Sequence, residues 1–362
     1  MKTMAEKFIP QFEPWIDDAE LRMLAECVAD NWITGGKKVK KFEERIAELC
    51  DVKYAIACCN GTLALYMGLK ALGIGQGDEV IVPDFTFIAS ANSVVLAGAE
   101  PVFVDVDPKT FNIDPDCAEE AITSKTRAIM PVHIYGQPAD MDAIMDLARE
   151  YNLKVIEDAA QAIGVTFNGK PMGGFGDVGC LSFYADKTIS AGEAGMILTD
   201  NPEIAENCLI QKHQGRTGRG IYIHEHIGYN FRLTDLQAAV GLAQLNKLPV
   251  IIDMKKKNEA LYRELLDGVV EFPYVDPRCF NVPFRVNILV DDPESLSDYL
   301  NKNNIGSRGF FYPLHMQPCY NQPGYFPASV CAYSRGLSLP SSARLTKEQI
   351  GYVCDKIKEY YI

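Results

Sequence analysis

Three features are missing from the sequence, and each absence excludes a class of protein. No apolar run approaches the length of a membrane helix, and residues 1–12 lack the apolar segment of a secretory signal. The eleven cysteines are odd in number, and no two of them are spaced Cys-x-x-Cys. This scatter argues against a disulfide framework and against a zinc or iron–sulfur site. We therefore expect reduced thiols, no metal and a cytoplasmic location.

Positive charge is also scarce. Lysine and arginine total 35 against 48 aspartates and glutamates, which gives a formal net charge of −13. Such a surface suits neither nucleic acid nor an anionic membrane. An anionic small-molecule substrate would have to meet local basic groups. The length of 362 residues and the 48% hydrophobic content predict a globular chain with a large domain and a smaller one.

Strand and helix patterns alternate through the first half of the chain. The expected strands are 54–58, 79–82, 101–106, 128–132 and 154–156, and the helices between them are 62–72, 88–97, 117–122 and 141–151. Alternation with short loops predicts an α/β fold with a mostly parallel sheet covered by helices. We expect a large domain over residues 1–247, including two N-terminal helices, and a smaller C-terminal α+β domain over residues 248–362.

Reactive side chains follow two apolar strands in the middle of the chain. The run 154–156 is followed by Glu157 and Asp158. The strand 178–183 contains Ser182 and is followed by Lys187. Ligands of open α/β sheets bind at the carboxyl ends of the strands, so an acid, a hydroxyl and an amine should meet there. Pyridoxal phosphate requires a lysine for its Schiff base, an acid at its ring nitrogen, and hydroxyls and N–H groups for its phosphate.

A second feature of this kind is the turn Asn60-Gly61-Thr62, between the first expected strand and its helix. The absence of a side chain on Gly61 allows close backbone approach, and a helix N-terminus presents free N–H groups with a positive dipole end. The turn therefore suits a phosphate, although a purely structural helix cap would have the same sequence.

Three segments resemble the DegT/DnrJ/EryC1/StrS family of sugar aminotransferases. They are Glu-Asp-Ala-Ala-Gln-Ala at 157–162, Gly-Asp-Val-Gly-Cys-Leu-Ser-Phe-Tyr at 176–184, and Lys-Thr-Ile-Ser-Ala-Gly-Glu-Ala-Gly at 187–195. The resemblance covers nearly the whole chain. It implies the fold-type I architecture with a mixed, mostly parallel seven-stranded sheet, pyridoxal 5′-phosphate as cofactor, and a homodimer with the active site at the subunit interface. It also implies amino transfer from L-glutamate to a nucleotide-linked keto-sugar.

The resemblance assigns roles residue by residue. Lys187 and Asp158 are the expected catalytic residues. The expected cofactor-binding residues are Gly61, Thr62, Phe87, Asp158, Gln161, Ser182, Lys187 and Asn230. Phe87 would stack on the ring, Gln161 would bind its phenolic oxygen, and Asn230 would reach the cofactor phosphate of the neighbouring subunit.

Substrate contacts are expected at six further positions: Trp32, Arg216, Arg219, Arg232, Tyr312 and His315. The resemblance places the Trp32 turn near the sugar nucleotide, although an anchored Gly-Gly turn explains it equally well. Together with Lys212, Arg216 and Arg219 are positive charges that could meet a diphosphate, and ordinary solvated loop charges are the alternative. His315 lies in a substrate-facing loop or is a buried, satisfied histidine.

Several activities stay open within this scaffold. The sequence after Lys187 is most similar to the group that aminates C4 of a 4-keto-6-deoxy sugar in perosamine-type synthesis, although Ala194 replaces a glycine of its usual motif. Amination at C3 is the alternative. A sugar dehydratase on this fold carries histidine in place of Lys187, and a non-catalytic regulator would not need the set of Asp158, Gln161, Ser182 and Lys187. The G-x-G-x-x-G match at 174–179 precedes a strand, so we reject a nicotinamide site there.

Overall fold

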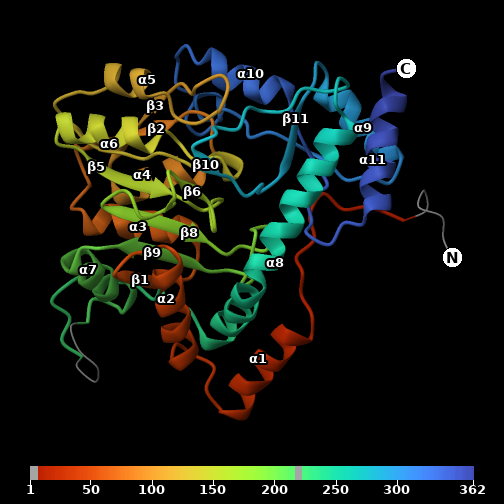
Figure 1. Ribbon diagram of the computed structural model, residues 1–362. Helices are drawn as coiled ribbons and strands as arrows, with labels where there is room; N and C mark the ends of the chain where they lie inside the picture. The colour runs from red at the N-terminus through yellow and green to blue at the C-terminus, as the bar shows by residue number, and fades with distance from the viewer. Residues whose placement is uncertain (1–6, 217–221) are drawn as a thin grey trace.

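The computed structural model describes residues 7–216 and 222–362. A large α/β body is connected by the long helix α8 (Asp235–Leu265) to a smaller group of strands and helices from the C-terminal part of the chain (Figure 1). The N-terminal segment runs beside this second group, because Ile9 pairs with Ile305 and lies in its core.

A seven-stranded sheet forms the centre of the large body. In spatial order its strands are β1 (Tyr54–Cys58), β9 (Gly195–Thr199), β8 (Val178–Ser182), β5 (Lys154–Asp158), β4 (Thr126–Ile129), β2 (Glu79–Pro83) and β3 (Glu100–Val104). Strand β9 is antiparallel to both neighbours, and all other pairs are parallel. The predicted mixed, mostly parallel sheet of seven strands is confirmed.

Helices cover both faces of this sheet. One face packs against α3 (Gly61–Ala71), α4 (Ala89–Ala97) and α7 (Pro202–Lys212), and the other against α2 (Lys37–Leu49), α6 (Met141–Glu150) and α8. Successive side chains of a strand point to opposite faces. Val155 therefore lies in the core beneath α2 and α6, and Ile156 lies in the core beneath α3 and α4. The same alternation directs Glu157 and Asp158 to different faces.

The remaining elements are short or belong to the C-terminal group. They are α1 (Asp18–Ala29), α5 (Pro115–Glu120), the 3-10 turns η2 (Ile134–Gly136) and η3 (Leu314–Met316), the small sheet of β10 (Cys279–Phe280), β6 (Thr166–Phe167) and β7 (Lys170–Pro171), the sheet of β11 (Val286–Leu289), β13 (Gly336–Leu339) and β12 (Arg308–Gly309), and the helices α9 (Pro293–Lys302), α10 (Pro327–Arg335) and α11 (Lys347–Tyr360). A capping box at Thr346 starts α11.

Helix α8 crosses the boundary that the sequence predicted between the two domains. Helix α8 begins at a Thr234 capping box and continues through Pro249 to Leu265. The proposed domain division after residue 247 thus falls inside one continuous helix, and it stays a prediction.

Two further properties of residues 7–216 and 222–362 bear on function. None of their helices has both the length and the apolar character needed to cross a bilayer. No three of their His, Cys, Asp or Glu side chains gather closely enough to hold a metal ion.

Candidate active site

Four strand ends meet at one edge of the central sheet. Asp158 pairs with Cys180 of β8, and Ser182 and Cys58 both pair with Gly195 at the start of β9. The turn after β1 and the end of β8 therefore lie close together, next to the end of β5. This edge is where an open α/β sheet binds ligands.

The carboxylate of Asp158 is buried and fixed by two donors. Ser90 Oγ on α4 donates to Oδ2 at 2.7 Å, and the backbone N–H of Ala160 donates to Oδ1 at 3.2 Å. Ser90 also hydrogen-bonds to Thr86, at 3.1 Å between the hydroxyl oxygens. This chain of contacts holds an acid at one orientation on the α3/α4 face of the sheet. The sequence reasoning missed Ser90, since a serine in an apolar helix carries no distinctive signal.

Gln161 is oriented by a backbone contact from η2. The N–H of Tyr135 donates to Gln161 Oε1 at 2.7 Å, which leaves the amide NH2 as the donor end of the side chain. Tyr135 adopts a φ of 54°, and the N–H of the preceding Ile134 donates to Asn112 Oδ1 at 3.2 Å. Gln161 is thus presented as a hydrogen-bond donor, which suits a phenolic oxygen.

The turn after β1 forms a cradle at the start of α3. Asn60 accepts from the N–H of Leu63 at 3.0 Å and so caps the helix. A Cβ at Gly61 would lie 2.9 Å from Ser182 Cβ, which is closer than side chains pack. Glycine here lets the half-buried Ser182 hydroxyl approach the first turn of α3, where Thr62 follows. Free N–H groups of a helix start and a hydroxyl suit a phosphate.

Lys187 lies between Asp158 and the C-terminal group. Its Nζ lies 4.7 Å from the centre of the Phe284 ring, and no described carboxylate forms an ion pair with it. Burial lowers the pKa of Lys187 below the ordinary lysine value, and Arg285 acts in the same direction while Asp186 and Asp158 oppose it. An amine that loses its proton readily is suited to act as nucleophile and base.

Aromatic side chains border the same edge. Phe87 is 54% exposed although it follows a buried strand, and its ring centre lies 5.8 Å from that of Phe311. Phe311 stacks on Tyr135 with ring centres 5.2 Å apart. The backbone N–H of Ser90 donates to the Phe87 carbonyl at 3.2 Å. The residue that carries the exposed ring is therefore hydrogen-bonded to the residue that holds Asp158.

Asn230 and Arg232 are placed differently from the residues above. Both are exposed, and no described contact joins either of them to Lys187. They precede α8, whose buried Asp235 accepts from the N–H groups of Gly36 at 2.8 Å, Val39 at 2.9 Å and Lys38 at 3.3 Å. This carboxylate caps α2.

Trp32 belongs to the turn that Asp235 fixes. The backbone N–H of Asp235 donates to the Thr34 carbonyl at 3.2 Å, and Trp32 is 51% exposed. The predicted Gly-Gly turn is therefore anchored against the segment that carries Asn230.

The three basic residues considered for a substrate diphosphate differ in their surroundings. Lys212 is buried and paired with Glu43 at 2.9 Å, so the sequence-based suggestion that it could meet a substrate diphosphate is wrong. Arg216 packs over the Tyr222 ring at 4.8 Å. Arg219 lies outside the described residues.

Tyr312 and His315 each contact side chains of neighbouring segments. The half-buried Tyr312 packs edge-on against Tyr333 at 5.0 Å. His315 Nδ1 lies 2.7 Å from Asp84 Oδ2, and its backbone N–H donates to Asp84 Oδ1 at 2.7 Å. Burial raises the pKa of Asp84, and the His315 contacts oppose that shift. The partly buried histidine thus connects η3 to the end of β2.

Glu157 has a structural role on the opposite face from Asp158. It accepts from the N–H groups of Gly173 at 2.8 Å, Phe175 at 2.6 Å and Gly176 at 2.8 Å. His133 Nδ1 accepts from the Ala139 N–H, so its Nε2 donates to Glu157 at 3.2 Å. The N–H groups of the glycine-rich turn are therefore occupied, which agrees with the rejection of a nicotinamide site.

The arrangement fits pyridoxal phosphate. Asp158, Gln161, Ser182, Gly61 and Lys187 present an acid, an amide donor, a hydroxyl, an open helix start and a half-buried amine along one sheet edge. These are the groups that the ring nitrogen, phenolic oxygen, phosphate and aldehyde of the cofactor need.

Comparisons with known proteins agree with this geometry. The model of the DegT/DnrJ/EryC1/StrS aminotransferase family matches residues 14–358. A protein of Escherichia coli O157:H7 named GDP-perosamine synthase is 40% identical over 98% of this chain and 99% of its own. A protein of Geobacillus stearothermophilus named pleiotropic regulatory protein is also 40% identical, over 94% of both chains.

Solved structures show the same fold. The PLP form of the putative sugar aminotransferase Spr1654 from Streptococcus pneumoniae has a TM-score of 0.92 at 27% identity, covering 97% of this chain and 98% of that one. The chain is a pyridoxal-phosphate-dependent enzyme and belongs to the DegT/DnrJ/EryC1/StrS aminotransferase family.

Proposed function

We propose that this enzyme transfers an amino group from L-glutamate to C4 of a nucleotide-linked 4-keto-6-deoxy sugar, as in perosamine-type amino-sugar synthesis. One observation supports an aminotransferase reaction. The half-buried Lys187 amine, which forms no ion pair with a described carboxylate, lies on the same sheet edge as the fixed Asp158 carboxylate. The position of amination rests on the name of the 40% identical relative from Escherichia coli O157:H7. In this proposal the enzyme acts in the cytoplasm, and its amino-sugar product is used to build a surface polysaccharide.

In this proposal each side chain has one task. Pyridoxal phosphate supplies an electron sink for the carbanion formed at the donor. Lys187 would hold the cofactor through its amine, and the same amine would accept the proton of the donor α-carbon. Asp158 keeps a proton at the ring nitrogen, and Gln161 donates to the phenolic oxygen. Gly61, Thr62 and Ser182 hold the phosphate, and Phe87 covers the ring.

A homodimer completes the proposed site. Asn230 is exposed and makes no described contact with the Lys187 edge of its own chain, which suits a role in the neighbouring subunit. Trp32 and Arg232 belong to the segments fixed by Asp235 and would meet the sugar nucleotide beside it. Arg216, Tyr312, His315 and, outside the described residues, Arg219 stay candidates for substrate contacts.

C3 amination of a nucleotide-linked 3-keto sugar is the main alternative. A dehydratase is disfavoured by a lysine, rather than a histidine, at position 187. The relative from Geobacillus stearothermophilus has a regulatory name, so a non-catalytic role is a further alternative. A regulator would not need the side chains of Asp158, Gln161, Ser182 and Lys187, which argues against that role.

One experiment tests the reaction type. Absorbance spectra of the protein with added pyridoxal phosphate are recorded before and after L-glutamate, for the wild type and Lys187→Ala. We expect L-glutamate to convert the lysine-bound cofactor to its aminated form in the wild type only. An identical spectrum in both proteins would contradict the proposal. Incubating the aminated enzyme with 4-keto and 3-keto nucleotide sugars then separates C4 from C3 transfer.

A further inference from the structure

A polar hollow lies beside the candidate active site, between the 134–137 loop and the C-terminal group. Its cavity volume is about 40 Å³, and its lining includes Tyr135, Gln137, Arg263 and Arg285. None of these residues has a role in the proposed reaction.

Two lining side chains carry buried polar atoms without partners. Arg285 is 5% exposed and Gln137 is 8% exposed. Within residues 7–216 and 222–362, Arg285 Nη1 and both amide atoms of Gln137 have no hydrogen-bond partner. A buried polar group left unpaired is destabilising, so three such atoms beside one hollow indicate a polar occupant.

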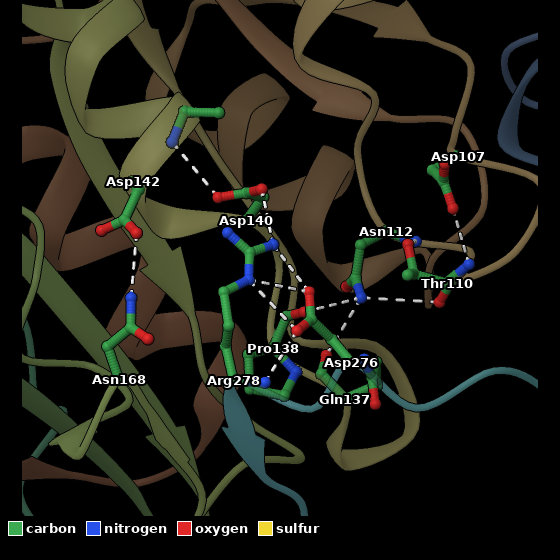
Figure 2. A network of polar contacts seen from close by, with 11 residues as sticks. Asp107, Thr110, Asn112, Gln137, Pro138, Asp140, Asp142, Asn168, Asp276 and Arg278 are labelled. Atoms are coloured by element: carbon green, nitrogen blue, oxygen red, sulfur yellow. Dashed lines mark hydrogen bonds and ion pairs between the residues drawn. The ribbon is translucent and has the colours of Figure 1, made fainter.

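Other contacts hold the Arg285 side chain and the backbone of Gln137 in position. Arg285 Nη2 lies 3.2 Å from Asp186 Oδ2, and the guanidinium packs over the Phe284 ring at 5.0 Å. Figure 2 shows the network around Gln137, in which Asn112 Nδ2 donates to the backbone carbonyls of Gln137 at 3.2 Å and Pro138 at 3.0 Å. The guanidinium of Arg285 is therefore preorganised, and the Gln137 side chain extends from a fixed backbone.

The free donor atoms of the hollow favour an occupant that accepts hydrogen bonds. Arg263, the other arginine of the hollow, is already paired with Glu259 at 3.0 Å. Lys255 lies close to Arg285, but burial lowers its pKa to about 7, and its described hydrogen bonds go to the carbonyls of Phe284 at 3.2 Å and Ser341 at 3.0 Å. Arg285 is also paired, through Nη2 with Asp186, so the free donor that it offers to the hollow is Nη1. A guanidinium donor forms its stronger hydrogen bonds with anionic acceptors.

We propose that this hollow binds the carboxylate group of a small organic acid through Arg285 and Gln137. One carboxylate oxygen accepts from Arg285 Nη1 and the other from Gln137 Nε2, and charge-assisted contacts of this kind are the stronger class of hydrogen bond. The amino donor or its oxo-acid product supplies such a group, and so does a separate metabolite.

An occupant would be connected to the candidate active site by two contacts. Arg285 is paired with Asp186, the residue before Lys187. Tyr135 lines the hollow and donates its N–H to Gln161. The site itself is defined by binding, so it does not depend on the proposed aminotransfer.

Calorimetric titration of the PLP-loaded protein with glutarate tests the proposal, because glutarate has two carboxylates but no amine or ketone. The proteins are the wild type, Arg285→Gln, Gln137→Met and the control Arg263→Gln. We expect saturable binding that is at least about tenfold weaker in the first two variants and within about threefold of wild type in the control. Gln137→Met leaves the Arg285–Asp186 pair intact, so it remains informative if Arg285→Gln fails to fold.

A second arm identifies the source of the carboxylate. Glutarate is titrated into Lys187→Ala protein with and without L-glutamate. Loss of glutarate binding in the presence of L-glutamate identifies the donor's own carboxylate, and simultaneous binding identifies a separate acid. The proposal is overturned if glutarate shows no saturable binding, or if all four proteins of the first arm bind it equally. It is also overturned if a crystal grown with saturating glutarate holds only water between Gln137 and Arg285.

Discussion

Ser90 Oγ donates to Asp158 Oδ2 across 2.7 Å, and this contact joins the start of α4 to the end of β5. Replacement of Ser90 by alanine removes the donor and frees the carboxylate to rotate. We expect the rate of the L-glutamate half reaction to fall about tenfold and the free energy of unfolding to fall by about 1 kcal/mol. Stopped-flow absorbance and urea titration measure the two effects.

The matched control for this change is Ser93→Ala. Ser93 Oγ is equally buried on the same helix and donates to the Ser90 carbonyl at 2.7 Å, not to Asp158. Its removal should cost stability alone. Equal rates in the two variants would show that the Ser90 contact does not serve Asp158.

Two neighbouring acids should respond in opposite ways. In Glu157→Gln an NH2 group would meet backbone donors, so we expect the free energy of unfolding to fall by about 3 kcal/mol while the folded enzyme keeps its half-reaction rate. In Asp158→Asn the ring-nitrogen proton loses its partner, so we expect at least a roughly 100-fold slower half reaction with little loss of stability. Urea titration and single-turnover absorbance check both. A large rate loss in folded Glu157→Gln would contradict the structural role of that residue.

Gly61 and Gly351 provide a pair of glycine tests. Gly61→Ala places a methyl 2.9 Å from Ser182 Cβ, so the cradle must widen and we expect pyridoxal phosphate to bind at least about tenfold more weakly. Gly351 lies in α11 with nothing near its missing Cβ, so Gly351→Ala should raise stability by about 0.5–1 kcal/mol. Cofactor titration and thermal unfolding measure these changes. Wild-type cofactor affinity in Gly61→Ala would show that the close approach to Ser182 has no bearing on the phosphate.

Lys255 should make stability depend on pH. Burial lowers the pKa of its amine to about 7, whereas in the unfolded chain the amine keeps its proton until the ordinary lysine pKa of about 10.4. Between these values the unfolded chain binds the proton and the folded protein does not, so stability rises with pH by at most about 1.4 kcal/mol per unit. We expect Lys255→Met to lose this slope in urea titrations from pH 7 to 9.

An exposed lysine two residues further on serves as its control. Lys257 pairs with Asp253 at the surface, and Lys257→Met should keep the wild-type slope. A slope that is unchanged in Lys255→Met would mean that Lys255 remains protonated inside the folded protein.

The parts of the fold that depend on local pattern were predictable. Tyr54–Cys58 was expected with the bounds that the structure has, and β5 extends the expected strand only by the two acids that follow it. Strand direction then places Asp158, Ser182 and Lys187 at one sheet edge without further information. The roles of Gln161 and Asn230 came from family resemblance, because neither position has a local signature.

Contacts between distant segments could not be predicted from the sequence. The positive φ of Tyr135 and its N–H contact to Gln161 depend on how η2 packs. Lys212 reads as a loop cation in the sequence, and only the fold brings Glu43 to it. The free Nη1 of Arg285 became visible only with every neighbour in place, since the local sequence does not show which donors of an arginine find partners.

The Asp235 cap has a consequence for recombination between relatives. One carboxylate from the first turn of α8 satisfies the backbone donors of Gly36, Lys38 and Val39, about 200 positions earlier in the chain. The two segments are therefore inherited as one unit. A chimera that takes residues 32–39 from one parent and the start of α8 from another keeps the Trp32 turn only if the second parent also supplies an acid at position 235.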